Sequence, residues 1–291
     1  MNLIGAEALA HLQSWQGHTQ TLQDCITAAP LQGMQALLDD ADASSAPDAE
    51  LPPVWHWLYF LPNTPQSQLG PDGHPRKGNF LPPVPLPRRM WAGGRVHWHA
   101  PLRSGQVVQR VSAIRKVDHK VGRSGELLFV QVEHHISHAE GLALTEIHDI
   151  VYRPLQTVHA SAAASPELPS PVWSQAVVPD DVMLFRYSAL TFNSHRIHYD
   201  RKYATETEGY PGLVVHGPLL VTWLMHLLRR HCPLAVASLT YKALKPVYEC
   251  ADQRRLRLCG APSADGHSAQ LWVEDHQGDT AMHATVVFQQ A

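Results

Sequence analysis

The side chains best suited to proton transfer in this sequence lie close together, between residues 193 and 200. They are Asn193, His195, His198 and Asp200. A histidine side chain has an ordinary pKa of about 6.5, so it can accept and return a proton near neutral pH. The pattern Asn193-x-x-x-x-His198-x-Asp200 therefore predicts acid/base catalysis with His198 as the proton carrier. For a histidine considered by itself, a structural role is the alternative.

A glycine and a proline downstream of this cluster add a second element. Gly217 and Pro218 open a long apolar segment that is expected to be a helix. Proline suits the first turn of a helix, and the glycine before it lets a ligand approach the backbone closely. Free N–H groups and the positive end of the helix dipole would then stabilise negative charge on a carbonyl oxygen. An ordinary helix start fits the same two residues equally well.

The other polar residues of the cluster have two interpretations each. Asp200 directly precedes the segment 201–208, which is expected to be helical, and aspartate is a favoured N-cap. Capping is therefore favoured over catalysis for Asp200. His195 and Arg196 are either solvated loop residues or contacts to a substrate.

Composition narrows the class of protein. The 291 residues are 44% hydrophobic and 17% charged, which is typical of a globular chain with a real core. A formal charge of −3 argues against nucleic acid or an anionic membrane surface as the main partner. No apolar run approaches the roughly 18–20 residues of a membrane span, and the first residues do not resemble a signal peptide. We therefore expect a cytoplasmic protein without a membrane partner.

The 20 histidines raise the question of a metal site. His97 and His99 share one face of an expected strand, and His134, His135 and His138 cluster in another. No HExxH motif occurs, and no carboxylate stands at a ligand-like spacing beside these residues. The four cysteines form no CxxC motif, which favours reduced thiols. The sequence thus predicts no metal site.

Two halves of similar organisation must position the candidate residues. Residues 1–40 are expected to be helical, and prolines between 62 and 87 predict a long irregular excursion over the surface. Strands are expected at 95–100, 106–118, 126–137 and 142–152, before an Ala/Ser/Pro linker at 161–171. The second half predicts a strand at 182–190, an amphipathic helix at 218–230, and strands at 235–248, 254–259, 269–274 and 280–289. The pattern indicates a duplicated antiparallel unit whose central helix is clear only in the second copy.

The motifs of the second half resemble those of the MaoC-like, or type 2, enoyl-CoA hydratases. That family carries Asp-x-Asn-Pro-x-His-x-Asp, followed by a Val-His-Gly helix start, which corresponds here to Val215-His216-Gly217. The segments 192–200 and 87–94 are typical of a two-domain branch with a FAS1-like dehydratase N-terminal half. This branch includes mesaconyl-CoA and itaconyl-CoA hydratases and hydroxyacyl-thioester dehydratase type 2. The resemblance covers residues from about 50 to 291.

The resemblance implies an α+β double hot-dog fold, in which antiparallel sheet wraps around a central helix in each half. Residues 1–160 would form the N-terminal helices and a degenerate hot-dog domain that shapes the acyl pocket and is catalytically silent. Residues 172–291 would form the catalytic hot-dog domain. A homodimer is possible.

The resemblance also assigns roles to residues. His198 falls on the catalytic histidine, and Gly217 on the glycine whose amide holds the thioester carbonyl. Asn193 stands in place of the catalytic aspartate; because an amide cannot take a proton, His198 would act alone while Asn193 orients the water. The substrate contacts expected from the matching segments, in addition to His195 and Arg196, are His216, Tyr210, Trp91 and Gly94.

The implied reaction is the addition of water to an enoyl-CoA, or its reverse. Arg196 could pair with a carboxylate on the acyl group, which favours a short dicarboxylic substrate of the mesaconyl or itaconyl type. No metal or redox cofactor is required, because CoA is part of the substrate. Lys242, Lys245 and Arg201 are either contacts for the CoA phosphates or solvated surface residues. The alternatives are a 3-hydroxyacyl-thioester dehydratase of fatty-acid synthesis, a hot-dog thioesterase and a non-catalytic acyl-thioester binding protein.

Overall fold

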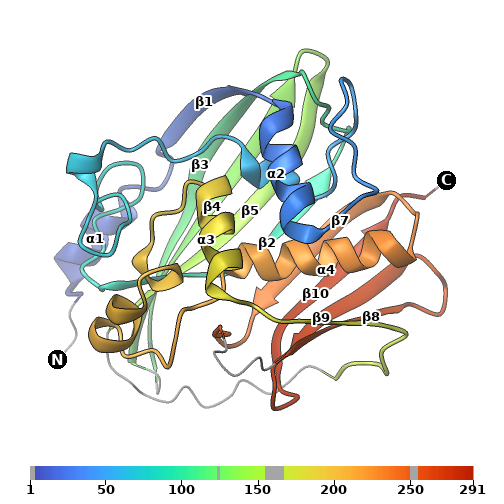
Figure 1. Cartoon of the computed structure of the whole chain (residues 1–291). Coiled ribbons are helices and arrows are strands. Elements are labelled where there is room, and N and C mark those ends of the chain that lie inside the picture. Colours follow the sequence, from blue (N-terminus) through green and yellow to red (C-terminus); the bar gives the residue numbers. More distant parts are fainter. Residues whose placement is uncertain (1–3, 123–124, 155–166, 250–254, 291) are drawn as a thin grey trace.

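The computed structural model describes residues 4–122, 125–154, 167–249 and 255–290. Within these ranges ten strands form one antiparallel sheet in the order β1-β3-β4-β5-β2-β7-β10-β9-β8-β6 (Figure 1). The strands are β1 (Thr19–Cys25), β2 (Arg88–Trp98), β3 (Val107–Gly122), β4 (Gly125–His138), β5 (Gly141–Arg153), β6 (Trp173–Val177), β7 (Val236–Ala243), β8 (Leu256–Pro262), β9 (Ser268–Glu274) and β10 (Thr280–Phe288).

The strand order confirms the predicted duplication. The first half contributes β1-β3-β4-β5-β2, and the second half contributes the equivalent order β6-β8-β9-β10-β7. The two halves join edge to edge through β2 and β7, from Gly93 opposite Lys242 to His97 opposite Ser238. The expected pair of sheets is therefore one continuous sheet. Most of the predicted linker lies outside the described residues, and the boundaries 1–160 and 172–291 stay a prediction.

Each half contains a helix at the same place in its strand order. Helix α2 (Ala28–Leu38) follows β1, and helix α4 (Gly217–His231) follows β6 after a longer segment. Both halves therefore contain a helix, as the resemblance implies, although the sequence pattern showed it clearly only in the second copy. The expectation that residues 1–40 are helical is met by helix α1 (Ala6–Gln13) and by α2, but it missed strand β1 between them.

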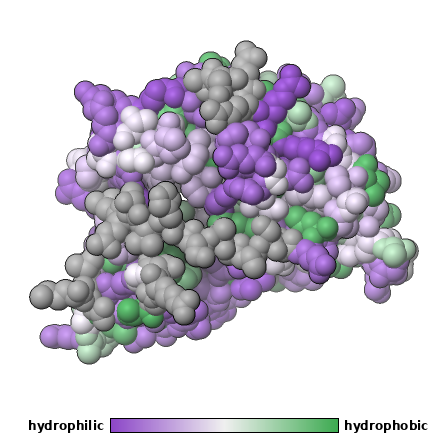
Figure 2. All heavy atoms as spheres, turned by 90° about the horizontal axis from the view of Figure 1, so that it is seen from below, coloured by the Kyte–Doolittle hydropathy of each residue, from purple (hydrophilic) through white to green (hydrophobic). Residues whose placement is uncertain are grey.

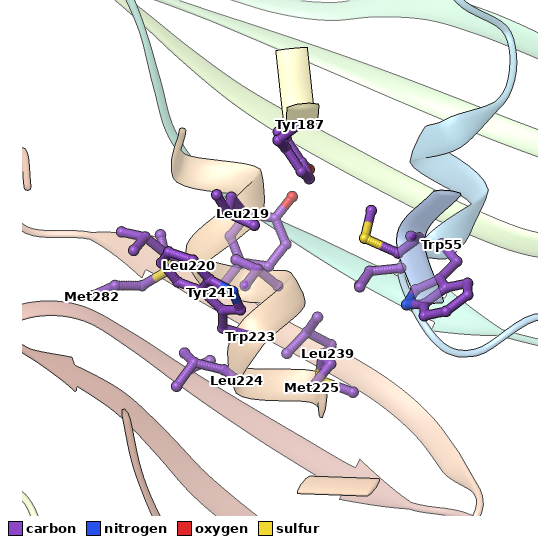
Figure 3. Packing of buried hydrophobic residues seen from close by; sticks show 14 of the residues in the cluster. Trp55, Tyr187, Leu219, Leu220, Trp223, Leu224, Met225, Leu239, Tyr241 and Met282 are labelled. Atoms are coloured by element: carbon purple, nitrogen blue, oxygen red, sulfur yellow. The ribbon is translucent and has the colours of Figure 1, made fainter. Parts of the chain in front are cut away.

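Helix α4 is enclosed more fully than an amphipathic helix would be. Every residue from Leu219 to Leu228 is buried, and the helix packs on β8 and β9. Figure 3 shows Leu219 and Trp223 of α4 in one cluster with Tyr241 and Met282 of the sheet and Trp55 of the first half. A helix that is apolar on all sides must be covered on all sides. The N-terminus of α4 is therefore fixed between the two halves.

The segment 182–190 is a helix and not the predicted strand. Helix α3 (Asp181–Leu190) starts at Asp180, whose Oδ1 accepts a hydrogen bond from the Met183 N–H at 2.7 Å. Leu184, Tyr187 and Ser188 are buried together on one face. The N-cap and the three- and four-residue spacing define a helix, whereas the apolar content alone suggested a strand. α3 brings Tyr187 and Ser188 towards the start of α4.

The proline-rich excursion covers the motif of the second half. It contains the short 3-10 turn Gln66–Gln68, and another, Trp55–Leu58, precedes it. The Arg196 N–H donates to the Asp72 carbonyl at 2.9 Å, and the Ser194 hydroxyl donates to the Gly73 carbonyl at 2.5 Å. Gly73 has φ +88°, and a Cβ at this position would collide with the Ser194 carbonyl. A segment far away in sequence is thus fixed against residues 194–196.

Candidate active site

A cavity of about 1310 Å³ lies between the two halves. Both halves line it, as does the proline-rich excursion; the lining includes Trp91, His148, Asp72, His74, Asn193, His195, His198, His216 and Gly217. Small-molecule sites are commonly cavities of about 300–1,000 Å³. The volume is therefore sufficient for an acyl group together with part of a carrier.

His198 is held as a neutral base. It ends the 3-10 turn Arg196–His198 and is buried, and its Nδ1 lies 2.7 Å from the Val214 carbonyl oxygen. A carbonyl can only accept, so Nδ1 carries the proton and Nε2 keeps its lone pair. Among the described residues, no group forms a hydrogen bond with this Nε2. Burial lowers the pKa of His198 to about 4, against the opposing effect of the Val214 hydrogen bond.

His216 supports the ring of His198. The two rings are stacked, with centroids 3.7 Å apart and an interplanar angle of 17°. His216 Nε2 lies 2.9 Å from the Ser188 hydroxyl of α3. Burial, and then the neighbouring His198, hold the pKa of His216 well below its ordinary value. Two stacked neutral imidazoles therefore face the cavity, and the contacts of His216 fit the orientation of His198.

The first turn of α4 presents open backbone amides beside these histidines. The first N–H groups of a helix have no intrahelical acceptor, and Pro218 has no N–H at all. Gly217 lines the cavity. A Cβ on Gly217 would lie 2.7 Å from Cε3 of Trp91, so glycine lets this indole pack directly on the helix start. Trp91 in turn stacks on Tyr241, with ring centroids 4.5 Å apart.

Asn193 shapes the turn that leads to His198. Its backbone N–H donates to the Ser188 carbonyl at 2.8 Å, and its Oδ1 accepts from the His195 N–H at 3.0 Å. The preceding residue, Phe192, has φ +47°. The side-chain NH₂ of Asn193 has no hydrogen-bond partner within the described part of the chain, and the residue lines the cavity. Its carboxamide therefore holds the turn and keeps a donor available.

The excursion adds two residues that the sequence analysis missed. The ring centroid of His74 lies 3.9 Å from that of His195, and the ring centroid of His195 lies 5.4 Å from that of His198. Asp72 forms an ion pair with His74 at 3.2 Å. Ligand atoms of Asp72, His74 and His195 all lie within 4.8 Å of one another, so this group could hold a metal ion. The pair Asp72-x-His74 was the available signal, but nothing in the sequence placed it beside His195.

Arg196 does not face the cavity, contrary to the expectation that it binds a substrate carboxylate. Its guanidinium pairs with Asp200 at 2.7 Å, donates to the Pro71 carbonyl at 3.0 Å and lies 4.1 Å from the centre of the Tyr203 ring. Asp200 Oδ1 accepts from the Tyr203 N–H at 3.0 Å, which confirms the predicted cap. The partners of Arg196 are thus already supplied by its own segment.

The remaining predicted contacts divide into two groups. Tyr210 and Trp91 line the large cavity, and Tyr210 lies 5.0 Å from the Arg88 guanidinium. Gly94 lies outside this cavity and lines a separate one of about 420 Å³, so its role as a substrate contact stays a prediction. A Cβ there would collide with the Ile147 carbonyl and the Tyr241 hydroxyl, so glycine serves strand packing.

Two of the three suggested phosphate contacts already have ionic partners. Arg201 pairs with Glu249 at 2.6 Å, and Lys245 pairs with Asp275 and Asp279, each at 2.7 Å. The solvated or structural alternative is therefore favoured for Arg201. Lys245 still lines the cavity, whereas Lys242 lies outside it.

The first half carries a second buried polar cluster on the wall of the same cavity. Glu146 lies 3.1 Å from His56, 2.8 Å from His148 and 2.7 Å from Nε1 of Trp57. The cluster extends further: Nδ1 of His148 lies 3.4 Å from Nε2 of His134, and Nδ1 of His134 lies 2.7 Å from the Ser112 hydroxyl. Burial opposes ionisation of Glu146, but His148 and His56 outweigh it and hold the pKa of this carboxyl well below its ordinary value.

The sequence comparisons decide the family. Residues 54–249 match the family model "Hydroxyacyl-thioester dehydratase type 2". The chain belongs to this family. It is 46% identical over 281 residues to mesaconyl-C(4)-CoA hydratase of Chloroflexus aurantiacus, covering 95% of this chain and 98% of that protein. It is 27% identical to the mitochondrial hydroxyacyl-thioester dehydratase type 2 of Schizosaccharomyces pombe, covering 87% of this chain and 92% of that protein. The predicted enzyme class, a hydro-lyase, is confirmed.

Solved structures confirm the fold. A MaoC-like dehydratase from Phytophthora capsici aligns with a TM-score of 0.69 at 13% identity, covering 97% of this chain and 98% of that structure. A Mycobacterium tuberculosis protein described as a double hotdog aligns with a TM-score of 0.59 at 12% identity, covering 94% and 96%. The double hot-dog prediction is therefore correct. In the described ranges, no helix is long and apolar enough to cross a membrane, and hydrophilic residues predominate among those coloured in Figure 2.

Proposed function

We propose that this enzyme adds water to the double bond of a short dicarboxylic enoyl-CoA of the mesaconyl type. The observation that carries the proposal is the fixed protonation of His198, whose Nδ1–H is bound to the Val214 carbonyl while Nε2 stays available as a base. This base shares a cavity with the open amide of Gly217. The similarity to a mesaconyl-C(4)-CoA hydratase over nearly the whole chain supports this substrate class.

The proposed reaction uses one histidine twice. His198 Nε2 takes a proton from a water molecule that the Asn193 side chain orients, and the water oxygen bonds to the β-carbon. The electrons of the double bond move towards the thioester carbonyl, whose oxygen gains negative charge. The Gly217 amide and the α4 dipole stabilise that oxygen, a contribution of roughly 3–4 kcal/mol for a good donor. His198 then returns its proton to the α-carbon.

The reverse reaction, dehydration of a 3-hydroxyacyl thioester, is the second candidate. The family match and the Schizosaccharomyces pombe relative favour it. The cavity wall argues against a long alkyl chain, because the ionised Glu146 and the guanidinium of Arg110 line it. Burying alkyl groups against such charges is unfavourable. The homodimer, the cytoplasmic location and the need for no cofactor beyond the CoA of the substrate stay predictions.

A substrate panel tests the proposal. Mesaconyl-C4-CoA, crotonyl-CoA and a long-chain enoyl-CoA are compared by the loss of conjugated-thioester absorbance. We expect the highest kcat/KM with mesaconyl-C4-CoA and no release of free CoA thiol. Thiol release with an unchanged double bond would identify a thioesterase, and tight binding without turnover a binding protein. A preference for the long chain would favour the dehydratase of fatty-acid synthesis.

A further inference from the structure

We propose that Arg89, together with His195 and His74, forms the subsite that binds the free carboxylate of the substrate. The inference rests on the proposed function and names the residues that select a dicarboxylic acyl group. It replaces the role first expected of Arg196, which is paired with Asp200 and lies outside the cavity.

The size of the substrate limits where such a subsite can lie. In a mesaconyl-type thioester the carboxylate is bonded to the carbon that water attacks. Its carbon is then about 4 Å from the thioester carbon, the span of three extended bonds. A group that binds this carboxylate must therefore lie beside both His198 and Gly217.

His195 lies beside His198, in the cavity that Gly217 also lines. It lines the cavity, and its ring stands at 89° to the His198 ring with centroids 5.4 Å apart. No side chain among the described residues hydrogen-bonds either ring nitrogen of His195. Its backbone is fixed by Asn193 on one side and by the docked excursion on the other. A rigid imidazole next to the base thus keeps an N–H donor for a ligand.

Arg89 supplies the charge. Side chains alternate along a strand, so Arg89 and Trp91 of β2 share one face, and Trp91 packs against Gly217. Burial lowers the pKa of both His195 and His74, and the nearby positive charge of Arg89 lowers each further. Arg89 itself lines the cavity. Arg88 is paired with Glu208 at 3.1 Å, whereas no carboxylate in the described part of the chain forms an ion pair with Arg89. A guanidinium binds a carboxylate through two parallel N–H groups.

The position of Arg89 also separates an anion subsite from a metal site. The Arg89 guanidinium would repel a cation bound by Asp72, His74 and His195, and it offsets the negative charge of Asp72 for a bound carboxylate. The Asp72 carboxylate pairs with His74 at 3.2 Å. Burial opposes its ionisation, but His74 and then the nearby Arg89 outweigh burial and lower the pKa of Asp72. Because a guanidinium carries five N–H donors, Arg89 can face Asp72 and the Tyr152 hydroxyl and still bind a ligand carboxylate.

The first test compares kcat/KM for mesaconyl-C4-CoA and crotonyl-CoA. Arg89→Gln should reduce the ratio of the two values about 30- to 100-fold, as expected when a charge-assisted contact is lost. Arg89→Lys should restore part of it. Arg95→Gln, on the same strand but exposed and outside the large cavity, is the matched control and should keep the wild-type ratio.

The second test measures binding without turnover, using the saturated probes succinyl-CoA and butyryl-CoA. Arg89→Gln and His195→Gln should each raise the Kd for succinyl-CoA at least tenfold more than the Kd for butyryl-CoA. Calorimetry measures both constants on protein with an unchanged melting temperature. Equal effects on both probes would overturn the proposal. So would a wild-type preference that disappears on chelation, because a metal would then bind the carboxylate. If the wild type prefers mesaconyl-C4-CoA and Arg89→Gln keeps that preference, the subsite alone is wrong. If the wild type shows no such preference, the proposed function fails with it.

Discussion

The two halves of the molecule each place buried histidines on the wall of one cavity, but with different neighbours. In the second half, His198 and His216 stack on each other, and burial without a carboxylate partner lowers the pKa of both. In the first half, His56 and His148 surround Glu146, which is held ionised. Isolated neutral imidazoles can accept a proton, whereas a carboxylate between two histidines forms an ionic anchor. We therefore expect the histidines of the second half to carry out the reaction and the Glu146 cluster of the first half to stabilise the fold.

The largest effect that should separate the two clusters is on stability. Glu146→Gln removes a fully buried charge from His56 and His148, and should lower the free energy of unfolding by about 3–5 kcal/mol. Urea unfolding measures the change. Glu133→Gln is the matched control, because Glu133 pairs with the exposed Arg115 and should cost less than about 1 kcal/mol. Equal losses in the two variants would mean that the Glu146 cluster is not an anchor.

Acid should destabilise the second-half cluster through its histidines. The unfolded chain protonates histidine at a pKa of about 6.5, whereas burial lowers the pKa of folded His198 to about 4. Between these values the unfolded state binds more protons, so stability falls as the pH drops from about 6.5 to 4. Each histidine shifted in this way contributes about 1.4 kcal/mol per pH unit within that window. Urea unfolding at intervals between pH 7.5 and 5 measures the slope.

His198→Gln should remove one proton from this linkage and flatten the slope by about 1.4 kcal/mol per pH unit at most. At pH 7.5 and above, the slopes of the variant and the wild type should agree. An unchanged slope at pH 5–6 would show that folded His198 protonates like an exposed histidine.

A smaller effect tests the helix start beside the base. Gly217→Ala places a methyl group 2.7 Å from Cε3 of Trp91, so the indole or the helix must shift. We expect kcat/KM to fall about 10- to 100-fold, because a displacement near 1 Å misplaces the oxyanion donor. Trp91→Leu in the same chain should recover part of the loss by making room. If Gly217→Ala alone retains full activity, close packing of Trp91 on Gly217 is not required.

The sequence was sufficient for local patterns and insufficient for long-range contacts. Apolar runs rich in β-branched residues and bounded by turns predicted the strands β3, β4 and β5, and the motif around His198 pointed to the candidate catalytic segment. Helix α3 was missed because its apolar residues also suit a strand, and only the Asp180 cap and the buried face decide between them. The position of Asp72 and His74 could not be predicted, because backbone contacts between the excursion and residues 194–196 place them beside His195.

The most direct test of the account substitutes one histidine in each cluster and measures both variants with the same substrate. Because His198 is the proposed base and His148 belongs to the anchor around Glu146, the two substitutions should differ sharply. His198→Gln should lower kcat for hydration of mesaconyl-C4-CoA at least about 1,000-fold with its fold intact by circular dichroism. His148→Gln should retain kcat within about tenfold in the fraction that is folded. A His198→Gln variant that retains most of its activity, or a His148→Gln variant that is folded and inactive, would contradict the assignment of the chemistry to the second half.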